Sequence, residues 1–360
     1  MTERLVRTYA DRRRGARRHL RTRGPLALTA LLLSALLAAC SGAQATTSQR
    51  TVPTPGPVSS ADLAKVTLKV GDQKAGLQTL LKAAGQDKDL PYTIEWSTFT
   101  SGPPLLEAAA SGAIDVGTVG NTPPIFAGAA KSPVSIVSAS RYNGKGDAIL
   151  VRKDSPATTL NDLKGKTIAV AKGSSAHGHL LLALNQAGLK PSDVNISYVA
   201  PSDGYAALKN GAADAWVVWD PYTAAAEQEI GARILLSGEG LVNGLGFQVA
   251  SNKSLADAGK NAAIEDLVVR SAKAYQWSAT HQDEWAKVYA TETGLSLAAT
   301  TVQAQRSVKN PITLDQEVIS SSQKLTDALA AGGFIPSSFD FSTIVDHRYD
   351  AAVSAVLGKA

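Results

Sequence analysis

The feature that most constrains the fold is a repeated alternation, from Val66 onward, of short β-branched runs with stretches rich in alanine and leucine. "VTLKVG" (66–71) leads into "LQTLLKAAG", and "KTIAVAK" (166–172) leads into "HLLLALNQAG". Strands that alternate with helices in this way indicate α/β architecture with largely parallel sheets. The tail from about residue 262 to 333 shows no strand-like run and is expected to be helical.

Two sheets of this kind in one chain predict two lobes. The crossings are expected near residues 148–153 and 246–252. Lobe 1 would then comprise residues 62–150 and 250–360, and lobe 2 residues 151–249.

The N-terminal segment has the pattern of a secretory signal. Residues 1–25 contain nine arginines but only two acidic residues, and "LALTALLLSALLA" (26–38) follows. This apolar run is shorter than the ~20 residues that span a membrane. Leu-Ala-Ala before Cys40 resembles a bacterial lipobox, which predicts a lipoprotein signal peptide over 1–39 and a lipid on Cys40. The Ser-, Thr- and Pro-rich stretch that follows predicts a flexible tether over 40–61.

Charge and cysteine content argue against a nucleic-acid-binding protein and against a protein held together by internal disulfides. Without residues 1–39 the chain has 27 Lys and Arg (36 less nine) against 29 Asp and Glu (31 less two). With no basic stripe, nucleic acid is not expected as a partner. Cys40 is the only cysteine, so an internal disulfide is ruled out.

Four of the predicted strand-to-helix junctions carry similar polar residues. Each junction would present unpaired N–H groups and the positive end of a helix dipole, which together can bind an anion without arginine. Ligands of open α/β sheets also gather at the carboxyl ends of strands. The four junctions are Asp72-Gln73-Lys74, Ser101-Gly102-Pro103-Pro104, Asn121-Thr122-Pro123-Pro124 and Ser174-Ser175.

The stretch "DAWVVWDPYTAAA" (214–226) ends another predicted strand. In one interpretation its aromatic residues are core and Asp220 caps the next helix. In the other, Trp219 and Tyr222 form a wall of the ligand cleft and Asp220 offers it a carboxylate.

The serine and histidine residues of "GSSAH" (173–177) could form a catalytic pair, a metal site or an anion site. A nucleophile elbow needs a second glycine that is absent here. His177 and His179 are two residues apart and point to different helix faces, and neither HExxH nor GxxxxGK[ST] occurs. We therefore expect no catalysis, metal or cofactor, with His177 as an orienting or rim residue.

Four segments together resemble the aliphatic sulfonate-binding proteins, the extracytoplasmic components of ABC importers related to taurine- and nitrate-binding proteins. They are "GDQK", "SGPPLLEAAASGAIDVGTVGNTPPIFA", "LKGKTIAVAKGSSAHGHLLLAL" and "DAWVVWDPY", and the resemblance covers roughly Val66 to Tyr349. It implies a type II periplasmic-binding-protein fold, in which two α/β lobes close on the ligand. The ligand-binding residues it implies are Gln73, Ser101, Gly102, Asn121, Thr122, Ser174, Ser175, His177, Trp219 and Asp220. Candidates for the apolar wall along the tail are Trp216, Trp219, Tyr222 and Phe247.

The chain departs from the family pattern at Asp72, where relatives often have Tyr or Val, and at Asn121, where they often have Asp. These changes put the preferred tail in doubt, but not the anionic head. The expected protein is a monomeric, lipid-anchored receptor on the outer face of the cell membrane. It would pass alkanesulfonates to an ABC permease and its ATPase as a sulfur source. The alternatives are taurine, nitrate, sulfate or another small anion as ligand, an enzyme similar to pyrimidine-precursor synthases, or a surface interaction protein.

Overall fold

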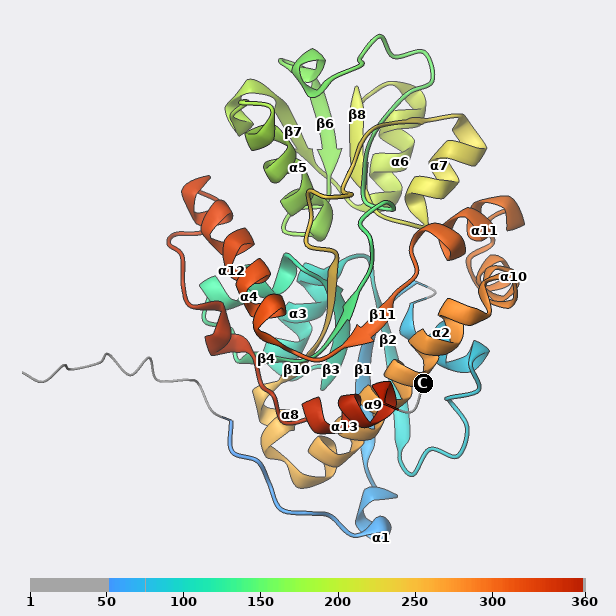
Figure 1. Ribbon diagram of the computed structural model, residues 1–360, viewed down its shortest axis with the longest axis vertical. Helices are drawn as coiled ribbons and strands as arrows, with labels where there is room; N and C mark the ends of the chain where they lie inside the picture. Colours follow the sequence, from blue (N-terminus) through green and yellow to red (C-terminus); the bar gives the residue numbers. More distant parts are fainter. Residues whose placement is uncertain (1–51, 75, 359–360) are drawn as a thin grey trace, which may run out of the picture. The chain divides into compact units, whose positions relative to one another are not determined.

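Two separate β-sheets organise the chain (Figure 1). The computed structural model describes residues 52–74 and 76–358. The first sheet has the strand order β11-β4-β10-β3-β1-β2, and the second has the order β7-β6-β8-β5-β9. The strands are β1 (Thr67–Gln73), β2 (Thr93–Phe99), β3 (Val116–Gly120), β4 (Val134–Arg141), β5 (Ala148–Val151), β6 (Thr167–Val170), β7 (Asn195–Tyr198), β8 (Ala215–Val218), β9 (Arg233–Ser237), β10 (Leu245–Ser251) and β11 (Asn310–Ile312).

Each sheet consists mostly of parallel strands and includes one central strand that runs antiparallel to its neighbours. β1 pairs in parallel with β2 and β3, whereas β10 runs antiparallel between β3 and β4. In the second sheet β6 is parallel to β7 and β8, and β5 is antiparallel to β8 and β9. Three strands, β9, β10 and β11, were not expected. β11 corrects the prediction of a strand-free tail, because Asn310–Ile312 adds to the edge of β4.

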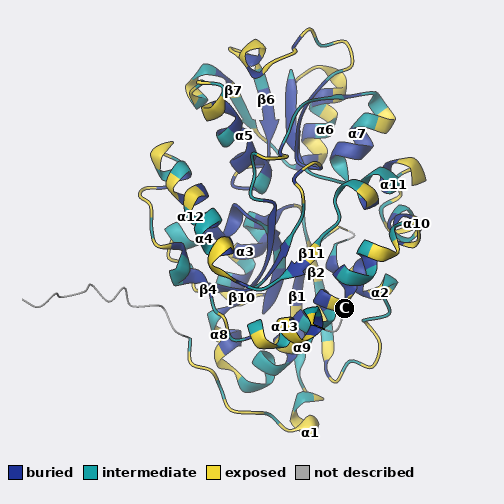
Figure 2. Cartoon of the chain, viewed as in Figure 1, coloured by how far each residue is buried: buried dark blue, intermediate teal, exposed yellow. Residues whose placement is uncertain are grey.

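Helices cover both faces of each sheet. On the first sheet, side chains of alternating strand positions enter two hydrophobic clusters, one under α2, α9, α10 and α13 and the other under α3, α4 and α12. The central strands are accordingly mostly buried, whereas the edge strands β2, β7 and β9 contain no buried residue (Figure 2). The helices are α1 (Ser60–Leu63), α2 (Leu77–Ala83), α3 (Gly102–Ser111), α4 (Pro123–Ala129), α5 (Ser175–Gln186), α6 (Pro201–Asn210), α7 (Tyr222–Ile230), α8 (Asn252–Ala256), α9 (Ala258–Thr280), α10 (Gln282–Thr293), α11 (Leu297–Arg306), α12 (Gln316–Ala331) and α13 (Asp350–Leu357).

The chain changes sheet twice, and both changes come before the predicted boundaries. β5 already pairs in the second sheet, so the first change lies between Arg141 and Ala148 rather than after residue 150. β10 already pairs in the first sheet, so the second lies between Ser237 and Leu245 rather than after residue 249. Within the described residues, both sheets belong to one compact unit.

The C-terminal helices connect the two lobes. α11 packs against α7 of the second lobe, and α12 packs against α5. Side chains from this tail can therefore reach a cleft that the sequence analysis assigned to strand ends alone.

The segment before the first strand is tied to the first lobe. Val52 packs against the core, and its carbonyl accepts a hydrogen bond from Arg348 at 2.8 Å. α1 begins at Ser60. The second half of the predicted tether therefore contacts the folded lobe, whereas the predicted signal peptide and Cys40 lie outside the described residues. Among residues 52–74 and 76–358, no helix is both long and apolar enough to cross a membrane.

Candidate ligand-binding site

A cavity of about 580 Å³ is lined by residues of both lobes. Its walls come from the ends of β1, β2 and β3, the start of α5, the segment before α7, and helices α9 to α11. The volume is within the roughly 300–1,000 Å³ that is usual for small-molecule sites. Of the predicted ligand-binding residues, six line it: Gln73, Gly102, Ser174, Ser175, Trp219 and Asp220.

The start of α5 presents unpaired donors to this cavity. Gly173, with φ of +73°, makes the tight turn after β6, and Ser174 then caps the helix by accepting the His177 N–H at 3.3 Å. The Ser174 hydroxyl itself donates to the Ala171 carbonyl at 2.7 Å. The Ser175 hydroxyl and N–H have no partner within the described part of the chain. These donors lie at the positive end of a 12-residue helix, an arrangement that can accept an anion without a charged side chain.

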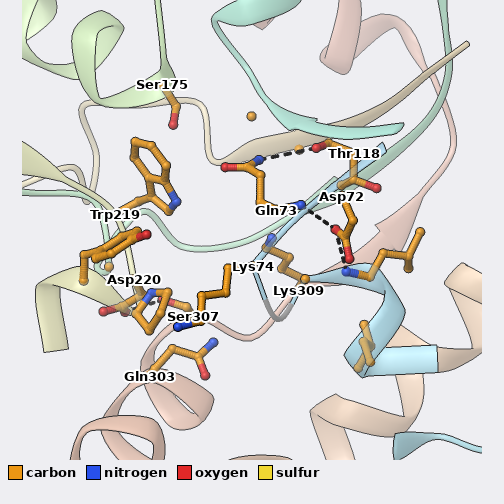
Figure 3. Close-up of a pocket in the computed structure, with 18 of the residues that line it drawn as sticks. Asp72, Gln73, Lys74, Thr118, Ser175, Trp219, Asp220, Gln303, Ser307 and Lys309 are labelled. Carbon is orange, nitrogen blue, oxygen red and sulfur yellow. Dashed lines mark hydrogen bonds between the residues drawn. The ribbon is translucent and has the colours of Figure 1, made fainter. Parts of the chain in front are cut away.

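The first lobe completes this end with glycine and glutamine. Pro103 and Pro104 lack an N–H, so Gly102 supplies the N–H of the first turn of α3 that can face a ligand. A Cβ on Gly120 would lie only 2.9 Å from the Ser175 Cβ, so glycine permits the two lobes to approach here. Gln73 turns its amide toward the Thr118 carbonyl at 3.4 Å (Figure 3).

The first predicted junction is already filled by the protein's own carboxylate. Asp72 accepts three backbone hydrogen bonds of 2.8–2.9 Å, from the N–H groups of Gln73, Leu77 and Gln78. Burial raises its pKa to about 6 in spite of these bonds. Asp72 therefore occupies the place that we expected for a ligand anion at the start of α2.

Asp220 lines the cavity, but its carboxylate is bound by the C-terminal tail. Arg306 of α11 donates to both carboxylate oxygens at 2.9 and 2.7 Å, and Ser307 donates at 2.6 Å. Asp220 also accepts the Ala224 N–H at 3.1 Å and so helps to cap α7. Arg306 reaches Glu227 as well, at 2.7 Å. The expected free carboxylate is instead part of an ion-pair network between the lobes.

Two more ionisable residues, Asp147 and Lys309, line the cavity. Asp147 accepts the Tyr142 hydroxyl at 2.7 Å, and burial raises the pKa of Asp147 to about 7. Lys309 also lines the cavity, and its burial lowers the pKa of its ammonium, an effect opposed by the charges of Asp147 and Asp72. Asp147, Lys309 and the Arg306 partner of Asp220 were not predicted, because no local pattern in the sequence separates a charge at the cavity from a surface charge.

The apolar wall differs from the predicted one. Trp219 and Tyr222 line the cavity and meet edge to face, with ring centroids 6.2 Å apart. Trp216 and Phe247 are each only 1% exposed and pack in the cores on either side, so neither is part of the wall. Their place is taken by aromatic residues of α9 and α10, namely Tyr275, Trp285 and Tyr289.

Four other predicted residues lie beside the cavity rather than on its surface. Ser101 and Thr122 are buried, and Asn121 uses its amide to bind Asn243 at 2.8 Å. His177, predicted as an orienting or rim residue, is 2% exposed and therefore does not lie on the rim; its ring stacks on Phe126 and meets Phe334 edge to face. Its Nδ1 accepts the Gly173 N–H at 3.1 Å, and burial lowers its pKa to about 4, so it is neutral at physiological pH.

Comparison with known proteins places this arrangement in a family. The sequence pattern of the NMT1-like family matches residues 75–292, more than half of the chain. The chain belongs to the NMT1-like family. The resemblance seen in the motifs is confirmed by a relative of Escherichia coli (strain K12) named as an aliphatic sulfonates-binding protein. It is 34% identical over 78% of this chain and 89% of its own length. A relative of the same name from Bacillus subtilis (strain 168) is 31% identical over 71% of this chain and 77% of its own.

Solved structures of NMT1-like relatives confirm the predicted fold class. The alkanesulfonate-binding protein SsuA from Xanthomonas axonopodis pv. citri, bound to MOPS, superimposes with a TM-score of 0.70 at 32% identity. That match covers 79% of this chain and 99% of the solved one. The fold also occurs in the desulfurization enzyme DSZB, with a TM-score of 0.56 at 18% identity, over 82% of this chain and 99% of that chain.

Proposed function

We propose that this chain is the exported substrate-binding component of an ABC importer, and that it captures aliphatic sulfonates as a sulfur source. The names of the relatives above 30% identity, all of them binding proteins, support this class. The periplasmic description of the solved Escherichia coli relative supports export. In this proposal the protein acts as a monomer, needs no cofactor, and passes its ligand to a permease with its ATPase.

The observation that carries the proposal is the set of neutral donors at the start of α5. A sulfonate at neutral pH has three acceptor oxygens and no proton to donate. The N–H groups of Ser175 and Gly102 are donors only, and the Ser175 hydroxyl can act as a donor. All three are neutral, so they need no counter-ion when the site is empty. The cavity continues from them along the rings of Trp219, Trp285 and Tyr289, which suit an alkyl tail.

Calorimetric titration with methane- to butanesulfonate tests this assignment. Each methylene buried against the aromatic wall should contribute about 0.8 kcal/mol. The three added methylenes of butanesulfonate should therefore increase affinity by roughly fiftyfold to a hundredfold. Trp219→Ala should flatten the series, whereas Trp277→Ala, on α9 and outside the cavity lining, should leave it unchanged.

Other anions in the same titration separate the competing ligands. A flat series in which sulfate, nitrate or phosphate binds as tightly as butanesulfonate would contradict the alkanesulfonate assignment. Tightest binding of taurine would redirect it to aminosulfonates. Turnover of a sulfonate that disappears in His177→Ala would contradict a pure binding role.

We propose further that a lipid on Cys40 holds the protein on the outer face of the cell membrane. Two acyl signals carried by this one residue suffice for stable anchoring, whereas a single chain would bind only marginally. The Cys40→Ser substitution should shift the protein from the membrane fraction to the soluble fraction, which fractionation of cells that express the variant measures. A variant that stays as membrane-bound as the wild type would contradict the anchor.

A further inference from the structure

Lys309 is a cation in the cavity wall without a direct partner. It follows α11 and precedes β11, whose pairing with β4 (Asn310 opposite Arg141) holds this stretch of backbone in place. Its side chain lines the cavity, and within residues 52–74 and 76–358 no hydrogen bond or ion pair reaches its Nζ. A buried cation without a partner is costly unless something else binds to it.

A second polar group in the cavity wall is also unsatisfied. Gln303 lines the cavity from α11, and its buried amide oxygen has no hydrogen-bond partner in the described part of the chain. The amide of a glutamine can be turned so that either its oxygen or its NH₂ group faces the cavity. By contrast, Arg306 and Ser307 of the same segment are fully engaged with Asp220 and Glu227. Of the polar residues that this tail contributes to the cavity lining, Ser307 is paired, whereas Gln303 and Lys309 have an unsatisfied group.

The carboxylates around Lys309 do not neutralise it by contact. Asp72 binds three backbone N–H groups, Asp220 binds Arg306, and Asp147 binds the Tyr142 hydroxyl. Burial raises the pKa of Asp147 to about 7 and that of Asp72 to about 6, so Asp147 is partly protonated near neutral pH. An anion beside Lys309 would therefore meet weaker repulsion than the number of aspartates suggests.

Neither Gln303 nor Lys309 lies at the neutral donors of α5. In Figure 3, Ser175 lies at the top of the pocket and Gln303 at the bottom, with Trp219 between them, while Lys309 lies near Asp72. A cavity of about 580 Å³ leaves room for more than a sulfonate head and a short alkyl tail.

We propose that Lys309 and Gln303 bind a second anionic group on the ligand, so that the preferred substrates are sulfonates with a carboxylate at the other end of the chain. This inference rests on the proposed function, in which the sulfonate head binds at the start of α5. The carboxylate accepts hydrogen bonds from the Lys309 ammonium and from the Gln303 amide turned toward it.

Three sulfonates of similar length test the inference by calorimetry on the wild-type protein. They are propane-1-sulfonate, with an apolar end, 3-sulfopropanoate, with a carboxylate, and 3-aminopropane-1-sulfonate, with an ammonium group. A charge-assisted hydrogen bond should make 3-sulfopropanoate bind tenfold or more tighter than propane-1-sulfonate. Equal affinities for these two ligands, or tightest binding of the amino compound, would overturn the proposal.

Variants locate the effect. Lys309→Gln should lower the ratio of the 3-sulfopropanoate to the propane-1-sulfonate affinity by about tenfold. Lys324→Gln, an exposed position on α12 outside the cavity lining, is the matched control and should leave the ratio unchanged. Gln303→Leu provides an independent variant of the same group and should also lower the ratio. A ratio that Lys309→Gln and Gln303→Leu both leave unchanged would overturn the assignment.

The same titrations distinguish failure of this inference from failure of the proposed function. If propane-1-sulfonate binds and 3-sulfopropanoate gains nothing, only the second anionic group is wrong. If none of the three ligands binds, the sulfonate receptor itself is wrong.

Discussion

At the α5 end of the cavity the Ser175 hydroxyl and N–H are neutral donors that no other described residue binds, whereas the polar groups at the Lys309 end are charged side chains, most of them already paired. Neutral donors at a helix N-terminus recognise an oxyanion through its acceptor oxygens alone. Charged groups in a partly buried wall are costly and respond to the exact charge of what binds there. In the proposed function, the first end would bind the anionic head of every ligand alike, and the second end would discriminate among tails.

The largest effect should come from removal of the cation that holds the charged end together. Arg306→Met would leave Asp220, only 3% exposed at its side chain, and Glu227 without their shared partner. Breaking a buried ion pair from one side typically costs about 3 kcal/mol or more. Urea unfolding should show this loss.

An exposed arginine provides the control for Arg306. Arg152 pairs with Asp154 at 3.3 Å, with side chains 34% and 81% exposed. Arg152→Met should change the free energy of unfolding by no more than about 1 kcal/mol. Equal losses in the two variants would contradict the interpretation of the Asp220 network as a buried structural element.

Ser175→Ala tests the neutral end. Removal of a donor to a charged group should weaken binding by roughly tenfold to a hundredfold. The loss should be the same for every sulfonate, because the head group is common to all of them. Calorimetric titration of short and long sulfonates measures it, and a loss confined to long-tailed ligands would place the head elsewhere.

The pH dependence of stability should reveal the charged end. Burial raises the pKa of Asp147 to about 7 in the folded protein, where Tyr142, Asp220 and Lys309 also act on it, from about 3.9 in an unfolded chain. Between these values the folded state binds more protons than the unfolded state. Its contribution to stability is thus complete below pH ~4 and is lost as the pH rises through 7, by at most about 1.4 kcal/mol per pH unit. Asp147→Asn should remove this slope in unfolding experiments from pH 5 to 8.

His177, behind the start of α5, should produce a slope of the opposite sign. Burial, with a smaller contribution from Lys172, holds its pKa at about 4, below the ~6.5 of an unfolded chain. Its contribution is therefore present above pH 6.5 and lost as the pH falls toward 4. Unfolding of His177→Phe should show less acid destabilisation than the wild type over that range, and an unchanged profile would contradict burial as the cause.

The smallest effect is expected at Ser174, next to Ser175. Its hydroxyl is already used, by the His177 N–H and the Ala171 carbonyl. Loss of an N-cap costs about 1 kcal/mol of stability. Ser174→Ala should therefore lower the free energy of unfolding by about that amount, with a smaller loss of sulfonate affinity than Ser175→Ala.

The local pattern predicted correctly those parts of the site that depend on neighbours in sequence. Glycine and serine at the end of a strand specify the turn and cap that begin α5, so the donors of Ser175 could be expected from the amino-acid sequence. The same reasoning placed Gly102, Gln73 and Trp219 at strand ends, and all three line the cavity. It failed for Trp216 and Phe247, because a core aromatic residue and a cleft aromatic residue look alike in sequence.

The sequence by itself therefore determined the family, the α/β alternation and the neutral donors, since each depends on residues a few positions apart. Only the tertiary structure decided which charges meet in the cleft. Asp220 and Arg306 are 86 positions apart, and they pair because α11 packs across onto α7. Asp72 could have faced a ligand but turns back onto the N–H groups of α2, because its carboxylate is close enough to bind them itself. Lys309 enters the cavity because β11, a three-residue strand with no signal in the sequence, adds to the edge of β4.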